Sequence, residues 1–223
     1  MKKVKVYELS YSVDEAITGV DDRQITGFID PENDSRKRTA EYQEIYYDLL
    51  GDDFDLTKFC ADEGAKPTDF LSSDYLNTDG VFISSDFIKL LDRFFICSHK
   101  YRDVYIKHLS EKKDYRFLNL IMCPNINFKE SSFVICDEVK DVKYEEIKLS
   151  SLQEFRDNIN KLSEKKGYDF TIAPQKIVLN STYDLFKYEL SGEFLISESL
   201  KNALENSALT GYEIEPFNVD VYH

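Results

Sequence analysis

The strongest hydrophobic pattern in the chain occurs twice, at residues 81–92 and 194–205. In each copy an apolar triplet with strand character runs into a serine, and apolar residues then recur at the three- and four-residue spacing of a helix. Ser84 and Ser197 stand at the junctions, where a serine side chain can cap the first helical turn. The pattern predicts two similar strand-to-helix corners. Their separation is too long for a solenoid, and the similarity is too local for a duplicated domain.

Elsewhere the periodicity predicts two further helices and several strands. A helix is expected over residues 39–50, and another begins at a capping-box spacing of Ser151 and Glu154 and ends at Gly167. Residues 66–79 suggest an irregular, turn-rich approach to the first corner. The expected strands are at residues 4–9, 25–29, 104–108, 115–123, 132–136, 143–147, 177–179, 185–190 and 212–216, with a further strand signal at Ile172.

The connections between residues 104 and 147 are too short for helical crossovers, so they favour an antiparallel sheet. We therefore expect an α+β fold, mainly antiparallel, with helices and the two similar strand-serine-helix corners. No low-complexity linker divides the chain, which predicts one domain over residues 1–223. An acidic N-terminal lobe over residues 1–78 is the one subdivision that the sequence suggests.

Charge narrows the classes of partner. The chain holds 42 acidic and 28 basic side chains, a formal net charge of −14. Residues 1–80 alone contribute 19 acidic and 9 basic side chains, a net charge of −10. Such a surface repels phosphate backbones and anionic membranes, so we expect no nucleic acid and no membrane partner. The acidity either serves solubility or steers a basic protein partner.

The four cysteines are Cys60, Cys97, Cys123 and Cys136, and they show no CxxC pairing. The N-terminus alternates like a strand and lacks the apolar run of a secretory leader. No apolar stretch approaches transmembrane length. The sequence therefore predicts reduced cysteines and a cytoplasmic protein.

Catalytic patterns are sparse. Cys97 and His99 could place a thiol near an imidazole, but no third group is evident to orient the pair. Ser84 and Ser197 lack the flanking glycines of a nucleophile elbow, which favours helix capping. The chain has only 8 Gly and no phosphate-cradling loop. We expect no enzyme activity and no cofactor.

The clearest candidate for partner binding is an acidic cluster after the predicted 39–50 helix. Asp52, Asp53 and Asp55 place negative charge at a helix C-terminus, where it opposes the helix dipole. They lack the glycine and closing glutamate of an EF-hand loop, so no metal is expected. A solvated loop has the same composition. The candidate partner-binding residues are Glu44, Tyr47, Asp48, Asp52, Asp53 and Asp55.

The second corner carries a family resemblance. Residues 196–204 and the following Leu209-Thr210-Gly211 phrase with its short strand resemble immunity family eleven, bacterial proteins of polymorphic toxin systems. Asp69-Phe70-Leu71 before the first corner is similar to the earlier half of the family pattern. The resemblance covers roughly residues 67–217 and is strongest over the last 30 or so.

The resemblance implies a protein without enzyme activity that binds a cognate toxin domain and occludes its functional surface. An acidic inhibitor can occupy a toxin surface that is built to attract phosphate. Two other functions stay open from the sequence. One is a cytoplasmic binding or scaffold domain, and the other is an enzyme that uses Cys97 or the carboxylates.

Overall fold

The computed structural model of the chain describes residues 1–21, 23–28, 58–72, 80–121, 125–140 and 142–223. Within these ranges the strands form three sheets, and most strand pairs are antiparallel, which confirms the predicted α+β class. The described helices are α1 (Glu15–Thr18), α3 (Ser85–Leu91), α4 (Leu152–Lys166) and α5 (Glu198–Glu205). Within the described ranges, no helix combines the length and the apolar character that a membrane span requires.

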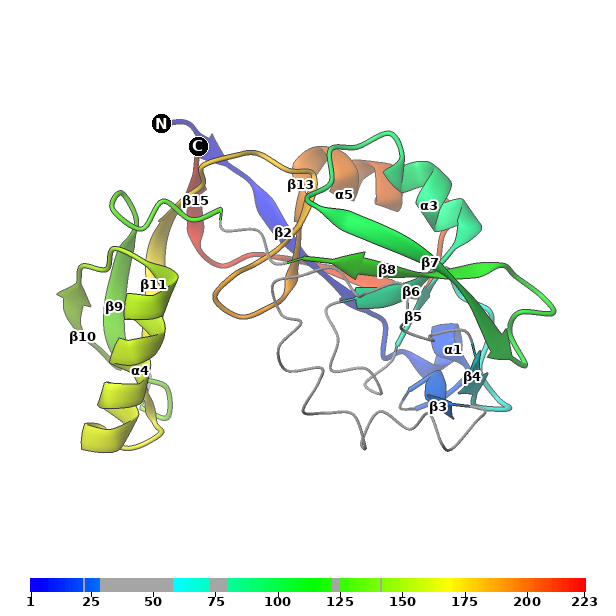
Figure 1. The fold of residues 1–223 in the computed structure, drawn as a ribbon, viewed down its shortest axis with the longest axis horizontal. Coiled ribbons are helices and arrows are strands. Elements are labelled where there is room, and N and C mark those ends of the chain that lie inside the picture. The colour runs from blue at the N-terminus through cyan, green and yellow to red at the C-terminus, as the bar shows by residue number, and fades with distance from the viewer. Residues whose placement is uncertain (22, 29–57, 73–79, 122–124, 141) are drawn as a thin grey trace.

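The three sheets differ in size and position (Figure 1). The five-stranded sheet has the order β1 (Lys3–Val4), β15 (Asp220–Tyr222), β11 (Phe170–Val178), β9 (Ser132–Asp137), β10 (Val142–Ile147). The four-stranded sheet has the order β12 (Leu185–Lys187), β13 (Phe194–Ser197), β2 (Val6–Tyr11), β14 (Tyr212–Pro216). The six-stranded sheet has the order β3 (Ile25–Phe28), β4 (Lys58–Ala61), β7 (His99–Lys107), β8 (Tyr115–Leu120), β6 (Gly80–Ser84), β5 (Phe70–Leu71).

A continuous apolar core joins the sheets. One cluster of buried side chains includes Ile177 of the five-stranded sheet, Leu195 of the four-stranded sheet and Leu118 of the six-stranded sheet. A second, smaller cluster belongs to the six-stranded sheet and contains Phe82 and Phe117, whose ring centroids lie 5.2 Å apart. Because burial of apolar surface is the main favourable term in folding, the larger cluster ties the three sheets together.

Both predicted corners are present, and both serines cap helices. The Ser84 side chain accepts a hydrogen bond from the backbone N–H of Phe87 at 3.1 Å, at the start of α3. The Ser197 side chain accepts one from the N–H of Leu200 at 3.2 Å, at the start of α5. In each case the serine satisfies a backbone donor that the first helical turn leaves free.

The repeat extends well beyond the corners. The first copy consists of β5, β6, α3, β7 and β8, with the sheet order β5-β6-β8-β7. The second copy consists of β12, β13, α5 and β14, and its sheet order is β12-β13-β2-β14. All neighbouring strands in both copies are antiparallel. The two copies therefore share one arrangement, but the N-terminal strand β2 takes in the second copy the place that β8 takes in the first.

Each capping serine is held by a carboxylate at the start of its own hairpin. The Ser84 hydroxyl donates to Asp69 at 2.6 Å, and the Ser84 N–H donates to the Asp69 carbonyl. The Ser197 hydroxyl donates to Asp184 at 2.5 Å, and the Ser197 N–H donates to the Asp184 carbonyl. We call these two arrangements the first and the second clamp. Each clamp fixes a hairpin to the helix that follows it.

The clamps also join the two copies reciprocally. In the first clamp, Asp69 accepts a hydrogen bond at 3.0 Å from the N–H of Thr210, in the loop that follows α5 of the second copy. In the second clamp, Asp184 accepts one at 3.0 Å from the N–H of Phe95, in the loop that follows α3 of the first copy. Such reciprocal contacts are typical of a two-fold relation between similar units.

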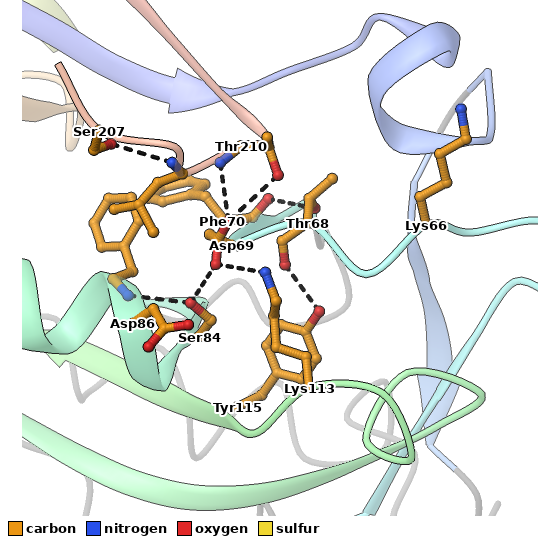
Figure 2. Close-up of polar contacts among 12 residues, drawn as sticks. Lys66, Thr68, Asp69, Phe70, Ser84, Asp86, Lys113, Tyr115, Ser207 and Thr210 are labelled. Carbon is orange, nitrogen blue, oxygen red and sulfur yellow. Dashed lines mark hydrogen bonds and ion pairs between the residues drawn. The ribbon is translucent and has the colours of Figure 1, made fainter. Parts of the chain in front are cut away.

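The first clamp, whose polar contacts are drawn in Figure 2, is the more deeply buried of the two and includes a lysine contact. Asp69 is 3% exposed and also accepts a hydrogen bond from Lys113 at 2.6 Å. The neighbouring Tyr115 hydroxyl donates to the carbonyl of Thr68 at 2.8 Å. A buried carboxylate is tolerated only when hydrogen bonds and charges satisfy it, and here both carboxylate oxygens are engaged.

Several elements differ from the sequence-based expectations. Residues 70–71 form β5 within the region predicted to be irregular, because they pair with β6. The strands expected between residues 104 and 147 pair antiparallel as predicted, but they belong to two sheets. The pairs β4–β7 and β11–β15 are parallel. The helix predicted over residues 39–50 lies outside the described residues.

The described strands of residues 1–78 are distributed over all three sheets. Strand β1 lies in the five-stranded sheet, β2 in the four-stranded sheet, and β3 to β5 in the six-stranded sheet. The acidic N-terminal lobe over residues 1–78 stays a prediction from the sequence, because residues 29–57 and 73–79 lie outside the described residues.

The two clamps should differ in their contribution to stability. Asp69→Ala removes a buried acceptor and leaves Lys113 without its partner, so we expect the free energy of unfolding to fall by about 3 kcal/mol. Asp184→Ala should cost about 1 kcal/mol, because Asp184 is less buried. Urea unfolding at pH 7 measures both values. Equal costs would contradict the difference in burial and pairing.

The second clamp should also have a pH dependence. Burial would raise the pKa of Asp184, but the hydrogen bonds from Ser197, the Phe95 N–H and Ser199 outweigh it and hold the pKa below its ordinary value of 3.8. A carboxyl with a lowered folded-state pKa stabilises the fold above its unfolded-state pKa and loses that effect as the pH falls through the folded-state value. The stability difference between wild type and Asp184→Ala should therefore shrink below about pH 4. A difference that stays constant down to pH 2 would contradict this assignment.

Candidate functional site

The predicted partner-binding residues cannot be placed. Glu44, Tyr47, Asp48, Asp52, Asp53 and Asp55 all lie outside the described residues. The acidic cluster after the 39–50 helix therefore stays a prediction from the sequence. The candidate site described below is built from other residues.

The contacts of Cys97 and His99 do not indicate an activated thiol–imidazole pair. The Cys97 side chain is fully buried, and its thiol contacts the carbonyl oxygen of Ile121 at 3.7 Å. The His99 ring nitrogen Nδ1 lies 2.8 Å from the carbonyl oxygen of Cys97. The imidazole is thus engaged by backbone, in contrast to the arrangement that an activated cysteine requires.

The serines and the acidic groups give little support to catalysis either. The hydroxyls of Ser84 and Ser197 are committed to the clamps, and Ser84 is fully buried. In the part of the chain that the structure describes, no three His, Cys, Asp or Glu side chains are grouped so that they could hold a metal ion. Among the described residues no disulfide joins Cys60, Cys97 and Cys136, and Cys123 lies outside these residues.

A groove lies where the two copies meet, between the four-stranded sheet and the β5–β6 hairpin. Its volume is about 250 Å³, and its exposed lining is mainly apolar. We call it the seam groove, and its principal lining residues are Glu8, Leu9, Phe70, Val81, Glu193 and Phe194. It combines an apolar wall with carboxylates, which is the composition of many specific binding sites.

Three glutamates lie on one face of the four-stranded sheet, and two of them, Glu8 and Glu193, line this groove. Glu8 on β2 is directly opposite Glu215 on β14. Glu8 also faces Leu195 on β13, and Glu193 lies two residues before Leu195, so its side chain is on the same face. Among the described residues none of the three glutamates forms an ion pair. The face therefore carries a local excess of negative charge.

The pKa of Glu8 reflects this arrangement. Partial burial raises the pKa above its ordinary value of 4.5, and the charges of Glu193 and Glu215 raise it further. Like charges directly opposite each other destabilise a sheet. The charge excess thus costs the fold some stability, and a cation in the groove would relieve that cost.

A buried tyrosine hydroxyl lies on the same face. Tyr188 is 4% exposed, and its N–H donates to the carbonyl of Glu193 at 2.8 Å, which places the two residues opposite each other. Its hydroxyl has no hydrogen-bond partner among the described residues. Burial raises the pKa of Tyr188, and the nearby charges of Glu193 and Glu189 raise it further. A buried polar group without a partner is uncommon and calls for an explanation.

Two other hollows are less suited to be sites. One, of about 490 Å³, is mainly polar and lies beside α1, with Glu15, Arg23 and Asp62 in its lining. The other, of about 340 Å³, contains Asp103 and Arg116, which form an ion pair at 2.8 Å. Both hollows have mainly polar linings, and the seam groove differs from them by its apolar wall.

Comparison of the chain with models of known protein families and with curated proteins gives no match. The resemblance to immunity family eleven therefore stays a prediction from the sequence phrase. Function has to be argued from the residues themselves.

The sequence predicts the polar strand faces that contribute to the seam groove, but it does not predict where in the fold these faces meet. Glu8 and Ser10 alternate with apolar residues along β2, and Glu213 and Glu215 alternate in the same way along β14. This alternation predicts one polar face on each strand. It does not reveal that strands from opposite ends of the chain are neighbours, and so the glutamates cannot be brought together from the sequence alone.

Replacing Glu8 should stabilise the protein. Glu8→Gln removes a like charge from the face while keeping the side-chain shape, so we expect the free energy of unfolding at pH 7 to rise by about 0.5 kcal/mol. A carboxyl with a raised folded-state pKa favours folding when it is protonated and loses that effect as the pH rises through the folded-state value. The gain should therefore vanish below about pH 4. Urea unfolding at several pH values tests both statements.

Glu145→Gln is the matched control, because Glu145 is exposed on β10 in the five-stranded sheet. It changes the net charge equally and should leave stability nearly unchanged. A loss of stability in Glu8→Gln at pH 7 would show that the carboxylate has a stabilising partner.

Proposed function

We propose that the chain is an immunity protein, which binds a cognate toxin domain in the cytoplasm and covers its functional surface. It acts by complementary shape and charge and carries out no chemistry of its own. The partner surface is basic. A contact of about 800 Å² on each protein is the size typical of tight protein inhibitors.

The observation that carries the proposal is uncompensated negative charge. The sequence has a net charge of −14, of which −10 lies in residues 1–80. In the described residues, Glu8, Glu193 and Glu215 gather on one face without ion pairs. Charge of this kind at an interface speeds association with a basic partner and disfavours acidic ones.

Two further observations support the proposal. The thiol, imidazole and hydroxyl groups considered for catalysis are engaged in structural contacts, as Cys97, His99 and Ser84 illustrate. The phrase at residues 196–216 resembles immunity family eleven. The reciprocal clamps hold both copies in one arrangement, which favours binding through a preformed surface.

The direct test is co-expression of the chain with the polypeptide that its neighbouring upstream gene encodes. We expect that polypeptide to inhibit growth, this chain to restore growth, and the two proteins to co-purify as a complex. Restored growth without a complex would contradict a mechanism of occlusion. A neighbour that is harmless and does not bind would remove the support for an immunity function.

The sequence-based contact region has a separate test. Charge reversal at Asp52, Asp53 and Asp55 together should weaken the complex by at least about tenfold, because close interfacial charges can each contribute on the order of 1 kcal/mol or more. Protection of growth and affinity in a titration are the measurements. Full protection by the triple variant would rule these residues out as contacts.

A matched control separates position from total charge. Charge reversal at Glu138, Glu145 and Glu146, which are exposed at β10 and in the turn before it, changes the net charge by the same amount. The control should bind as wild type does. An equal loss in both triple variants would assign the effect to net charge and not to the Asp52–Asp55 region.

A further inference from the structure

We propose that the seam groove binds one lysine or arginine side chain that a partner protein presents. The inference rests on the proposed function for the statement that the partner is a protein with a basic surface. The preference of the groove for a cationic side chain is independent of that function and can be tested with a small molecule.

The two copies of the repeat provide an internal comparison. Glu8 faces Leu195 on β13, and the equivalent pair in the first copy is Phe117 on β8 facing Phe82 on β6. Phe82 and Phe117 are fully buried in the second apolar cluster, where they pack against Phe59 and Ile25. The same position therefore holds a fully buried phenylalanine in the first copy and a half-buried carboxylate that lines the seam groove in the second.

The shape and polarity of the groove suit a long cationic side chain. Phe70, Val81 and Phe194 supply an apolar wall in a groove of about 250 Å³. Lysine and arginine lay their methylene stems along apolar surface while the charged end group reaches polar partners. A bare metal ion would gain nothing from such a wall. A phosphate group would meet the carboxylates of Glu8 and Glu193 and be repelled.

The polar groups at the groove suit the end group of such a side chain. The carboxylates of Glu8 and Glu193 offer oxygen acceptors, and an ammonium or guanidinium group has only donors. Hydrogen bonds between such ions are among the strongest in proteins. A bound cation would therefore neutralise the excess charge of Glu8 and Glu193, both of which line the groove.

The proposal predicts opposite effects of one substitution on stability and on binding. Removing the charge of Glu8 relieves repulsion with Glu193 and Glu215 in the free protein. The same change removes an acceptor from the bound cation. If Glu8 served only the fold, neutralising it would not both stabilise the protein and weaken its binding of a cation.

The test uses N-acetyl-arginine amide as the probe and N-acetyl-citrulline amide as its uncharged isostere. Titration of the isotope-labelled full chain, followed by amide NMR signals, should show binding of the arginine compound in the millimolar range. The shifts should centre on the amides of Gly192, Glu193 and Leu9. The citrulline compound should bind at least about fivefold more weakly, because it lacks the charge.

Variants locate the effect. Glu8→Gln combined with Glu193→Gln should lower the affinity for the arginine compound at least about fivefold. Glu145→Gln combined with Glu146→Gln is the control for net charge and should bind as wild type does. Unfolding curves of every variant show that the fold is retained.

Three results would overturn the proposal: no shifts at the groove amides, equal binding of the citrulline compound, or unchanged affinity in the Glu8 and Glu193 double variant. If only the proposed immunity function is wrong, the results differ from these three. The arginine compound would still bind at the groove, while the neighbouring gene product would neither inhibit growth nor form a complex.

Discussion

Two carboxylates, Asp69 and Asp184, join the two copies of the repeat to each other. Each one accepts a hydrogen bond from the serine that caps its own helix and another from the backbone after the helix of the other copy. A carboxylate oxygen can accept more than one hydrogen bond, so a single side chain can order a hairpin, a helix start and a distant loop together. The relative position of the two copies, and hence the seam between them, depends on these contacts.

The sequence reveals the local parts of this arrangement and not the global ones. The corners, the capping serines and α4 follow from periodicity and capping residues, which act within a few positions of each other. The role of the two clamp carboxylates cannot be predicted from the sequence. The backbone N–H groups that donate hydrogen bonds to them lie far away along the chain, as Asp69 and Thr210 illustrate. The two-residue strand β5 is hidden for a similar reason, because only its pairing with β6 defines it.

The seam groove shows the same limit at the level of function. Glu8, Glu193 and Glu215 come from three strands and two ends of the chain, and only the order β13-β2-β14 makes them neighbours. The net charge of the chain is consistent with a basic partner, but it does not show which residues carry uncompensated charge. Equivalent positions of the two copies differ, since Phe117 is buried opposite Phe82 in the first copy, whereas Glu8 lies opposite Leu195 at the groove in the second.

The place of β2 has a consequence for synthesis of the protein. This strand lies between β13 and β14, and β1 pairs with β15 near the C-terminus, so the first residues find their partners only when the last ones exist. Ribosomes add roughly 5–20 residues per second, which leaves the N-terminal strands unpaired for on the order of ten seconds or more. The six-stranded sheet can form earlier, because β3 to β8 lie within residues 25–120. In a nascent chain the six-stranded sheet can therefore precede the four-stranded sheet, and the surface around Glu8 forms only after residues 194–216 have left the ribosome.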